Sequence, residues 1–386
     1  MAKATVIANH SLPLRPNLFD PLLLIAALGL MSFGVLMVAS ASMVISQQQY
    51  GYSFHFLYHQ GIYLLLGLLL AGFSFRVPIK FWQSCRGVLL LVSFVLLMIV
   101  LIPGIGREVN GSIRWLVLGP VALQVSELAK LAVVIFLAGY LTTHQQEVRV
   151  APRGFIKPMI IFSLMAFLLL LEPDFGATVV IFCTVLGMLF LAGVQLRYFL
   201  FLILISGLAF GSLAVLSPYR LQRLTTFLHP WANQYGSGYQ LTQSLIAFGK
   251  GGWFGVGLGD SVQKLFYLPE AHTDFLFAVL GEELGLVGLL TVLLLFIIFI
   301  SRGFKISSNE FKNKNYFPAY LAFGLSLWIG LQALINMGVN LGALPTKGLT
   351  LPFISYGGSS MLINCLVLGL LLRIDHEARL QRPSRR

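Results

Sequence analysis

The chain has 386 residues, of which 57% are hydrophobic and only 10% charged, and its formal net charge is +12. Soluble domains carry about 25% charged residues, so this composition excludes a soluble globular protein and predicts an integral membrane protein. In such a chain the positive charge reports membrane topology rather than nucleic-acid binding.

Ten apolar stretches are each long enough to cross about 30 Å of hydrocarbon. They cover residues 20–42, 56–75, 86–103, 124–142, 156–172, 177–194, 198–216, 274–301, 317–341 and 358–374. The sequence therefore predicts an all-α integral membrane protein of about ten transmembrane helices, with a single membrane domain over residues 20–374.

The first stretch ends in Ala39-Ser40-Ala41, which resembles a signal-peptidase site. It is longer than the roughly 7–15 apolar residues of a signal peptide, so we expect an uncleaved span.

Lysine and arginine are concentrated in the segments that a cytoplasmic N-terminus would place inside the cell. The positive-inside rule then predicts that both termini are cytoplasmic, as tails over residues 1–19 and 375–386.

Residues 217–273 form a large loop on the outer, periplasmic face, between the seventh and eighth spans. Loops longer than about 15 residues usually have a function. This loop is rich in glycine and aromatic residues, so we expect short helices that lie on the membrane surface.

Four side chains before and within the fourth span could contact a ligand. Inserting a charged group at membrane depth costs roughly 2.5–3.5 kcal/mol, so its presence indicates a structural or functional role. Glu127 and Lys130 lie three residues apart on one helical face. They form either a buried ion pair that fixes helix packing or a site in which Lys130 attracts a polyanion. In the preceding outer loop, Arg114 could hold a phosphate with two parallel hydrogen bonds, and Trp115 could stack on a sugar or anchor the loop at the membrane interface.

A second polar cluster lies where the long loop enters the eighth span and contains Glu270, His272 and Asp274. At a helix N-terminus the dipole favours the Asp274 carboxylate, whereas burial opposes its charge. Such a group suits a general base, but Asp is also a preferred N-cap residue, and both roles remain open. His272 has no second ligand at metal spacing, so we expect a structural role. Of the deeper Glu282 and Glu283, at least one should line a polar interior, because adjacent residues cannot both face lipid cheaply.

The run from Gly342 to Ser360 contains Pro345 and Pro352, which forbid a continuous helix. Irregular backbone at membrane depth must be buried in protein or line a cavity. We therefore expect Lys347 to present its ammonium group into a cavity.

Three other features predict no function. The cysteines (Cys85, Cys183 and Cys365) lie in or beside apolar runs without CxxC spacing, which indicates neither disulfides nor a metal site. Asp174-Phe175-Gly176 matches a kinase motif but lies in a tight outer turn without kinase lobes. The glycines at 249–259 lack the βαβ context of a nucleotide-binding loop.

Several sequence blocks together resemble the signature of the SEDS family, which comprises the FtsW, RodA and SpoVE proteins. The blocks are Asn110-Gly111 with Arg114-Trp115, 126–130 (SELAK), 173–176 (PDFG), 268–275 (LPEAHTDF), 281–285 (GEELG), and Asn336 with Gly342, Pro345, Gly348 and 353–360 (FISYGGSS). The resemblance covers essentially all ten predicted spans. Residues 345–348 (PTKG) with Leu351-Pro352 resemble the division branch of the family, FtsW.

This resemblance implies a peptidoglycan glycosyltransferase that polymerises lipid II into β-1,4 glycan strands for septal wall synthesis during cell division, with inversion and release of undecaprenyl pyrophosphate. By matching position, Asp274 is the essential catalytic carboxylate, and it would act as a general base opposite the leaving group. The residues expected to bind substrate are Arg114, Lys130, Lys347, Glu127 and Ser355. Those expected to support the site are Trp115, Glu270, His272, Glu282, Glu283, Pro345, Tyr356, Gly357 and Gly358.

The sequence has no multi-carboxylate cage, so we expect no built-in cofactor and no metal site. Any Mg or Mn would be shared with the substrate pyrophosphate. The resemblance implies a multi-pass protein of the inner membrane at the division septum. Its implied partners are lipid II, undecaprenyl-linked glycan, a class B penicillin-binding protein transpeptidase of the FtsI type, and division regulators of the FtsQLB and FtsN types. No nucleic-acid partner is expected.

Two other functions compete with the enzyme. One is a flippase that transports lipid II, and the other is a division scaffold in which Asp274 would be dispensable. A flippase needs a polar path across the whole membrane, whereas the ionisable groups here cluster near the outer face, with little polar below Glu282 and Glu283. This distribution favours the enzyme.

Overall fold

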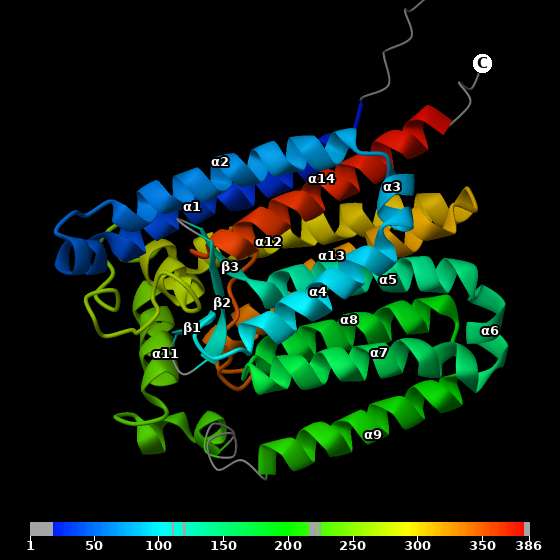
Figure 1. The fold of residues 1–386 in the computed structure, drawn as a ribbon. Coiled ribbons are helices and arrows are strands. Elements are labelled where there is room, and N and C mark those ends of the chain that lie inside the picture. The colour runs from blue at the N-terminus through cyan, green and yellow to red at the C-terminus, as the bar shows by residue number, and fades with distance from the viewer. Residues whose placement is uncertain (1–17, 110–111, 119–120, 216–221, 223–224, 382–386) are drawn as a thin grey trace, which may run out of the picture.

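The computed structural model describes residues 18–109, 112–118, 121–215, 222 and 225–381, and most of them are helical. The longer helices run roughly alongside one another in a bundle (Figure 1). The helices are α1 (Pro21–Tyr50), α2 (His55–Arg76), α3 (Ile79–Ser84), α4 (Arg86–Val100), α5 (Val125–Thr143), α6 (Gln145–Val150), α7 (Pro152–Leu171), α8 (Phe175–Ala192), α9 (Leu196–Val215), the 3₁₀ helix η1 (Pro230–Asn233), α11 (Tyr239–Gly251), α12 (Leu276–Lys312), α13 (Tyr316–Asn340) and α14 (Gly358–Gln381).

Eight of the described helices are long and apolar enough to cross a membrane: α1, α2, α5, α7, α8, α12, α13 and α14. Two shorter apolar helical stretches, Arg86–Val100 and Leu196–Ile205, fall where the other two spans were predicted. The chain is therefore a mostly helical, multi-pass membrane protein, as the sequence predicts, while the total of ten spans stays a prediction.

The two described ends of the chain lie side by side. The backbone oxygen of Leu18 is 2.8 Å from Nδ1 of His376, near the end of α14. Asp20 caps α1 by accepting from the backbone N–H of Leu22 at 3.0 Å, and its other carboxylate oxygen pairs with Arg302 of α12. The chain therefore enters and leaves the bundle at the same end.

The connection between α4 and α5 is a three-stranded antiparallel sheet, which corrects the all-α prediction. Its strands are β1 (Gly106–Val109), β2 (Ser112–Leu118) and β3 (Val121–Gln124), in the order β1-β2-β3. Strand β2 (SIRWLVL) is rich in β-branched and aromatic residues. The sequence pair Asn110-Gly111 between two such runs is a strong hairpin signal. Because these strands are only four to seven residues long, they are easily mistaken for a loop between two membrane helices.

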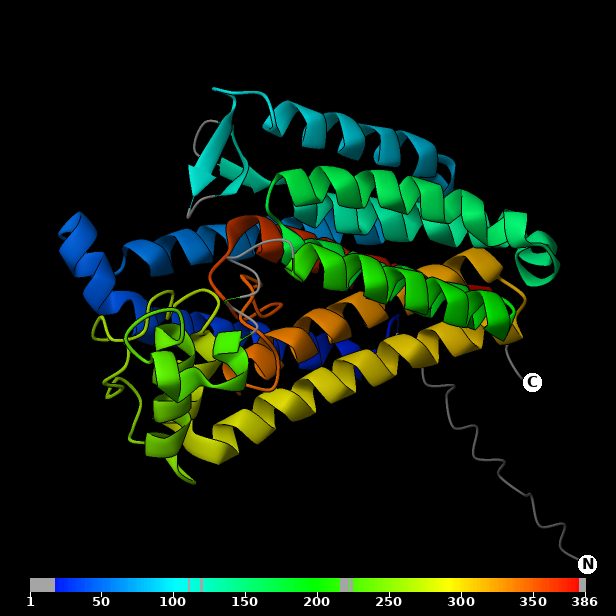
Figure 2. The same ribbon diagram turned by 90° about the horizontal axis from the view of Figure 1, so that it is seen from below.

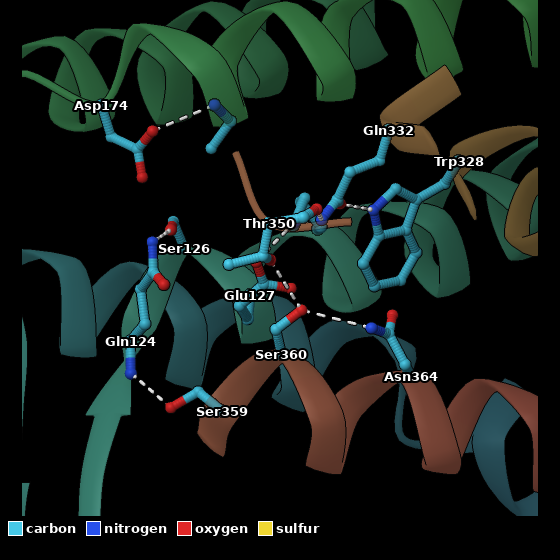
Figure 3. Close-up of polar contacts among 12 residues, drawn as sticks. Gln124, Ser126, Glu127, Asp174, Trp328, Gln332, Thr350, Ser359, Ser360 and Asn364 are labelled. Carbon is cyan, nitrogen blue, oxygen red and sulfur yellow. Dashed lines mark hydrogen bonds and ion pairs between the residues drawn. The ribbon is translucent and has the colours of Figure 1, made fainter. Parts of the chain in front are cut away.

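The sheet is joined to the bundle through Ser359 in the first turn of α14. Its hydroxyl accepts from the backbone N–H of Gln124 at 2.8 Å (Figure 3). The same hydroxyl donates to the backbone oxygen of Ala122 at 2.9 Å. One side chain thereby satisfies a donor and an acceptor on the outer edge of β3, and the sheet has a fixed position over the bundle.

The long segment between α9 and α12 contains η1 and α11, in keeping with the expected short helices. Both views place α11 and the sheet at the same end of the bundle (Figures 1 and 2). Several aromatic side chains of this segment are highly exposed, namely Trp231, Tyr235, Trp253 and Phe254. Their exposure is the pattern expected of rings at headgroup depth.

Helix α12 is broken at Gly285, where φ is 63° and ψ is −161°. The segment that follows α11 supplies the backbone groups that the break leaves unpaired. The N–H of Leu286 donates to the oxygen of Gly252 at 3.0 Å, and the N–H of Val256 donates to the oxygen of Glu282 at 2.9 Å. The irregular backbone is therefore hydrogen-bonded within the protein, as the membrane environment requires.

The two carboxylates beside this break are both fully buried. Glu282 accepts from the hydroxyl of Ser261 and from the backbone N–H of Gln263. Glu283 pairs with Lys264 at 2.8 Å and accepts from the hydroxyl of Ser40 in α1 at 2.6 Å. Both therefore have partners in a polar interior and hold the long segment against α1 and α12.

The break at Gly285 yields a stability prediction. A Cβ at this position would lie 2.4 Å from the backbone nitrogen of Gly255, in a conformation that only glycine adopts readily. We expect Gly285→Ala to lower the free energy of unfolding by about 3 kcal/mol or more. Gly72→Ala on α2, where the added methyl group meets open space, is the matched control. Thermal denaturation in detergent measures both, and equal melting temperatures would show that the backbone exchange does not hold the break.

Candidate active site

A cavity of about 400 Å³ lies at the end of the bundle that carries the sheet. Its walls come from α2, the sheet, the first turns of α5 and α8, the residues before α12, and the segment between α13 and α14. It is lined by charged, aromatic and glycine residues together. Of the polar residues singled out in the sequence, Arg114, Trp115, Glu127, Glu270 and Asp274 line this cavity.

Asp274 and Arg114 both line this cavity. They approach each other across Gly348. A Cβ placed on this glycine would lie 3.2 Å from Oδ2 of Asp274 and 3.8 Å from Nη2 of Arg114. The predicted carboxylate and the predicted phosphate-binding cation thus share one cavity, although 160 residues separate them in the chain.

The N-cap residue of α12 is Phe275, which directly follows Asp274, and the Phe275 side chain makes no capping bond. The backbone N–H of Ala278, in the first turn, donates instead to Oδ1 of Asn340 on α13 at 3.2 Å. Of the two roles that the sequence left open for Asp274, the geometry favours the one in which its carboxylate faces the cavity.

An acidic pair lies next to Arg114, in the turn between α7 and α8. Asp174 caps α8 by accepting from the backbone N–H of Ala177 at 3.0 Å, and its Oδ2 lies 3.9 Å from Nη1 of Arg114. Glu172 is fully buried. Burial, reinforced by the charge of Asp174 and opposed by that of Arg114, raises the pKa of Glu172 to about 8. Glu172 is therefore mostly protonated at neutral pH.

Glu127 and Lys130 form the predicted ion pair, with 2.8 Å between Oε1 and Nζ. Glu127 lines the cavity, whereas Lys130 is 1% exposed and lies behind it. Nζ of Lys130 also donates to Oε1 of Gln332 at 2.7 Å. Gln332 in turn donates to the backbone oxygen of Thr350 at 3.0 Å (Figure 3). Lys130 therefore does not line the cavity, and its network holds α5, α13 and the segment before α14 together.

The segment from Leu341 to Gly357 is irregular, as its prolines predict. The ammonium of Lys347 lies 4.0 Å from the ring centre of Phe175, next to Gly348 in the cavity wall, although Lys347 itself does not line the cavity. The hydroxyl of Ser355 accepts from the backbone N–H of Leu351 at 2.9 Å and closes a turn away from the cavity. This placement gives no support to the prediction that Ser355 contacts substrate. Pro345 lies in the same segment, also outside the cavity lining.

Aromatic and glycine residues are among those predicted to support the site. Trp115, Tyr356, Gly357 and Gly358 all line the cavity. Gly358 is needed for packing, because a Cβ there would lie 2.5 Å from the ring of Tyr63 on α2. The wall therefore offers flat apolar surfaces beside charged groups, a combination typical of carbohydrate sites.

The loop before Asp274 is rigidly built. Glu270 lines the cavity with a φ of 56°, and its Oε2 accepts from the hydroxyl of Thr273 at 2.7 Å. The ring of His272 packs against Phe56 and Tyr356, with ring centres 4.6 and 5.7 Å away. Burial lowers the pKa of His272, against the opposing charge of Glu270. A neutral, aromatic-packed imidazole fits the structural role predicted for this residue.

Four polar atoms of cavity-lining residues are buried without a hydrogen-bond partner among the described residues. Two are donors, Nε of Arg114 and Nε1 of Trp115, and two are acceptors, Oε2 of Glu127 and Oδ2 of Asp174. Buried polar groups are normally paired, so the wall is built to take a ligand that both donates and accepts hydrogen bonds. A sugar joined to a phosphate has this character.

Several residues of the cavity were not selected from the sequence. Asp174 was set aside with the outer turn as a match to a kinase motif, and Glu172, Arg107 and Tyr63 were not singled out, yet Asp174, Arg107 and Tyr63 line the cavity. The charge of Asp174 and Glu172 at the end of an apolar run was the available signal. No comparable signal marks Tyr63, because aromatic residues are common at membrane interfaces.

Among the described residues, no group of three or more His, Cys, Asp or Glu side chains is placed to hold a metal ion. Asp274, Asp174, Glu127 and Glu270 line the cavity individually. A divalent ion would have to take most of its ligands from a bound pyrophosphate and water.

The fold and the cavity define a multi-pass membrane protein with a charged, aromatic-lined site at one end of its helix bundle. The model of the FtsW/RodA/SpoVE family, described as cell cycle protein, matches residues 21–380. The chain belongs to this family.

Curated relatives are similar over nearly the whole chain. A probable peptidoglycan glycosyltransferase FtsW of Legionella pneumophila is 58% identical over 368 residues, which are 95% of this chain and 93% of the relative. A protein of the same name from Coxiella burnetii is 58% identical over 93% of this chain and 96% of its own length.

Solved structures have the same fold. A chain from a peptidoglycan synthase complex, described as coordinating polymerization and crosslinking, superposes with a TM-score of 0.77 at 29% identity, covering 94% of this chain and 99% of that one. The rod shape determining protein RodA of Thermus thermophilus superposes with a TM-score of 0.69 at 28% identity, covering 94% and 98%.

The raised pKa of Glu172 gives a test of the acidic pair. Between about pH 4.5 and pH 8 the folded protein keeps a proton that the unfolded chain releases, so Glu172 makes stability fall as the pH rises through this window. Glu172→Gln removes the effect. We expect the stability of this variant to rise relative to the natural chain between pH 5 and pH 8, by at most about 4 kcal/mol. Melting curves in detergent measure the difference, with Asp260→Asn on the exposed loop as control. A difference that does not change with pH would refute the account of Glu172.

Proposed function

We propose that this chain is a peptidoglycan glycosyltransferase that polymerises lipid II into β-1,4 glycan strands for the septal wall. The observation that carries the proposal is the cavity in which Asp274 faces Arg114 across Gly348. Its unpaired donors and acceptors suit a sugar pyrophosphate, and its aromatic walls suit sugar rings. The names of the similar proteins give the same activity.

In the proposed reaction Asp274 is the general base. The C4 hydroxyl of the N-acetylglucosamine of one lipid II attacks the anomeric carbon of the growing chain, and the Asp274 carboxylate takes the hydroxyl proton. The new C–O bond forms as the bond to pyrophosphate breaks on the opposite face, so the configuration inverts, as in inverting glycosidases. Undecaprenyl pyrophosphate leaves with the electron pair of the broken bond.

The leaving pyrophosphate needs cations more than it needs a general acid. Arg114 supplies a guanidinium in the cavity, with a buried Nε that has no acceptor among the described residues. Arg107, which lines the same cavity from β1, adds a second charge. Lys130 and Lys347 lie outside the lining and contribute through their field. A divalent ion carried by the pyrophosphate would add charge neutralisation at the same place.

The alternative function, transport of lipid II across the membrane, has less support. A transported headgroup needs a continuous polar path, but the space directly beneath Lys130 has no room for a water molecule. Its lining in the described structure is mainly apolar and includes Val133, Val134, Val180 and Ile181. The polar groups are therefore arranged for chemistry at one face.

The proposed setting is the inner membrane at the division septum, with ten spans, both termini in the cytoplasm and the cavity on the periplasmic face. The chain that superposes from a peptidoglycan synthase complex supports a transpeptidase partner. We propose a class B penicillin-binding protein of the FtsI type, with regulators of the FtsQLB and FtsN types. The FtsW name of the similar proteins supports the division role.

The direct test is polymerisation of labelled lipid II by the purified protein in complex with its transpeptidase, followed by gel analysis of the glycan. We expect Asp274→Ala to lower the rate by about 10²–10⁴-fold, as for the loss of a general base. Asp260→Ala removes an exposed carboxylate from the same long segment and should leave the rate unchanged. Polymer formation by Asp274→Ala at the natural rate would overturn the assignment. Movement of lipid II across vesicles without any polymer would favour the transporter.

The close approach at Gly348 gives a second test. A methyl group there would press on Oδ2 of Asp274 from 3.2 Å without removing any charge. We expect Gly348→Ala to reduce the polymerisation rate by about tenfold or more, because a displaced base loses its alignment with the hydroxyl. Gly249→Ala on α11, where the methyl group meets open space, is the matched control. Unchanged kinetics in Gly348→Ala would show that Asp274 does not work from this position.

A further inference from the structure

Two buried asparagines of α13 bind the backbone of Asp274. Asn336 and Asn340 lie one helical turn apart and are 2% and 0% exposed. Nδ2 of Asn336 donates to the carbonyl oxygen of Asp274 at 2.9 Å, and Nδ2 of Asn340 donates to the same oxygen at 3.0 Å. One carbonyl oxygen thus accepts from two side chains of a neighbouring helix, which fixes its position relative to α13.

Asn340 also replaces the missing N-cap of α12. Its Oδ1 accepts from the backbone N–H of Ala278 at 3.2 Å, while its Nδ2 donates to the carbonyl oxygen of Asp274. In most helices the residue at the N-cap provides this acceptor with its own side chain. Here a residue of α13 provides the acceptor for the backbone N–H of Ala278.

Asn336 connects the same carbonyl to the opposite wall of the cavity. Its second N–H donates to the backbone oxygen of Leu349 at 2.6 Å. Leu349 follows Gly348, the residue over which the Asp274 carboxylate lies. The two hydrogen bonds of one amide therefore set the spacing between the carboxylate and the segment between α13 and α14.

We propose that Asn336 and Asn340 are positioning residues, which hold the Asp274 carboxylate at a fixed depth and angle toward Arg114. The proposal rests on the function proposed above for Asp274. It assigns Asn340 the task of joining the backbone of Asp274 to the first turn of α12, and Asn336 the task of setting the distance between Asp274 and the cavity wall. Neither side chain lines the cavity, so both act through Asp274.

The first test is kinetic and uses the complex of the protein with its transpeptidase. We expect Asn336→Ala and Asn340→Ala each to lower kcat for glycan polymerisation by about 10- to 100-fold, because a small displacement of a catalytic group has effects of this size. KM for lipid II should change little, since substrate contacts remain. Ser244→Ala is the matched control. It removes a buried hydroxyl that donates to the backbone oxygen of Asn340 at 2.7 Å and leaves both amides in place.

The second test does not depend on activity. A water-insoluble carbodiimide modifies carboxyl groups, and peptide mass spectrometry measures its rate of reaction at Asp274. We expect this rate to change severalfold in both asparagine variants and to stay at the natural value in Ser244→Ala, with modification at the exposed Asp260 as internal reference. Melting curves show whether each variant is folded.

The possible outcomes separate this inference from the proposed function. Natural kcat and natural Asp274 reactivity in folded Asn336→Ala and Asn340→Ala, while Asp274→Ala is inactive, would overturn the positioning role alone. An active Asp274→Ala would overturn the function proposed for Asp274 first. Equal losses in Ser244→Ala and in the asparagine variants would show a merely structural role and would also overturn the inference.

Discussion

A carboxylate and a guanidinium must stay charged beside each other at the edge of an apolar helix bundle, and the rest of the site is arranged around this requirement. Charges at membrane depth are expensive unless they are paired or reach water. Among the described residues, Lys130 pairs with Glu127 and Lys264 pairs with Glu283 inside the bundle. Asp274 and Arg114 instead line a cavity, where Arg114 also lies 3.9 Å from Asp174.

Backbone N–H and C=O groups near the site are also hydrogen-bonded. The break in α12 is closed by hydrogen bonds from the segment after α11, and the N-terminus of α12 is capped by Asn340 from α13. The edge of the sheet is closed by Ser359. Each of these contacts joins segments far apart in the sequence, so the cavity walls are held by the bundle as a whole. A rigid frame of this kind is what a site needs when catalysis depends on position.

The fold class and several charged members of the site could be predicted from the sequence, because both stand out against an apolar background. Asp274, Arg114 and Glu127 were rare polar residues in or near long apolar runs, and all three line the cavity. The sheet was missed because strands of four to seven residues give little periodic signal. The roles of Asn336 and Asn340 could not be predicted, because their partner Asp274 lies 62 and 66 residues away and its bonded atom belongs to the backbone. The sequence left Lys130 open between packing and binding, and its burial behind Glu127 became visible only in the structure.

The central claim is that the cavity divides its work between two charged groups, Arg114 binding the pyrophosphate and Asp274 taking the proton. Equilibrium binding of a short-chain isoprenoid pyrophosphate to the detergent-solubilised protein tests this division directly. The account predicts that Asp274→Asn binds as tightly as the natural chain, whereas Arg114→Ala binds about tenfold or more weakly, as for the loss of a charged hydrogen bond. Unchanged binding in Arg114→Ala, or a loss confined to Asp274→Asn, would contradict it.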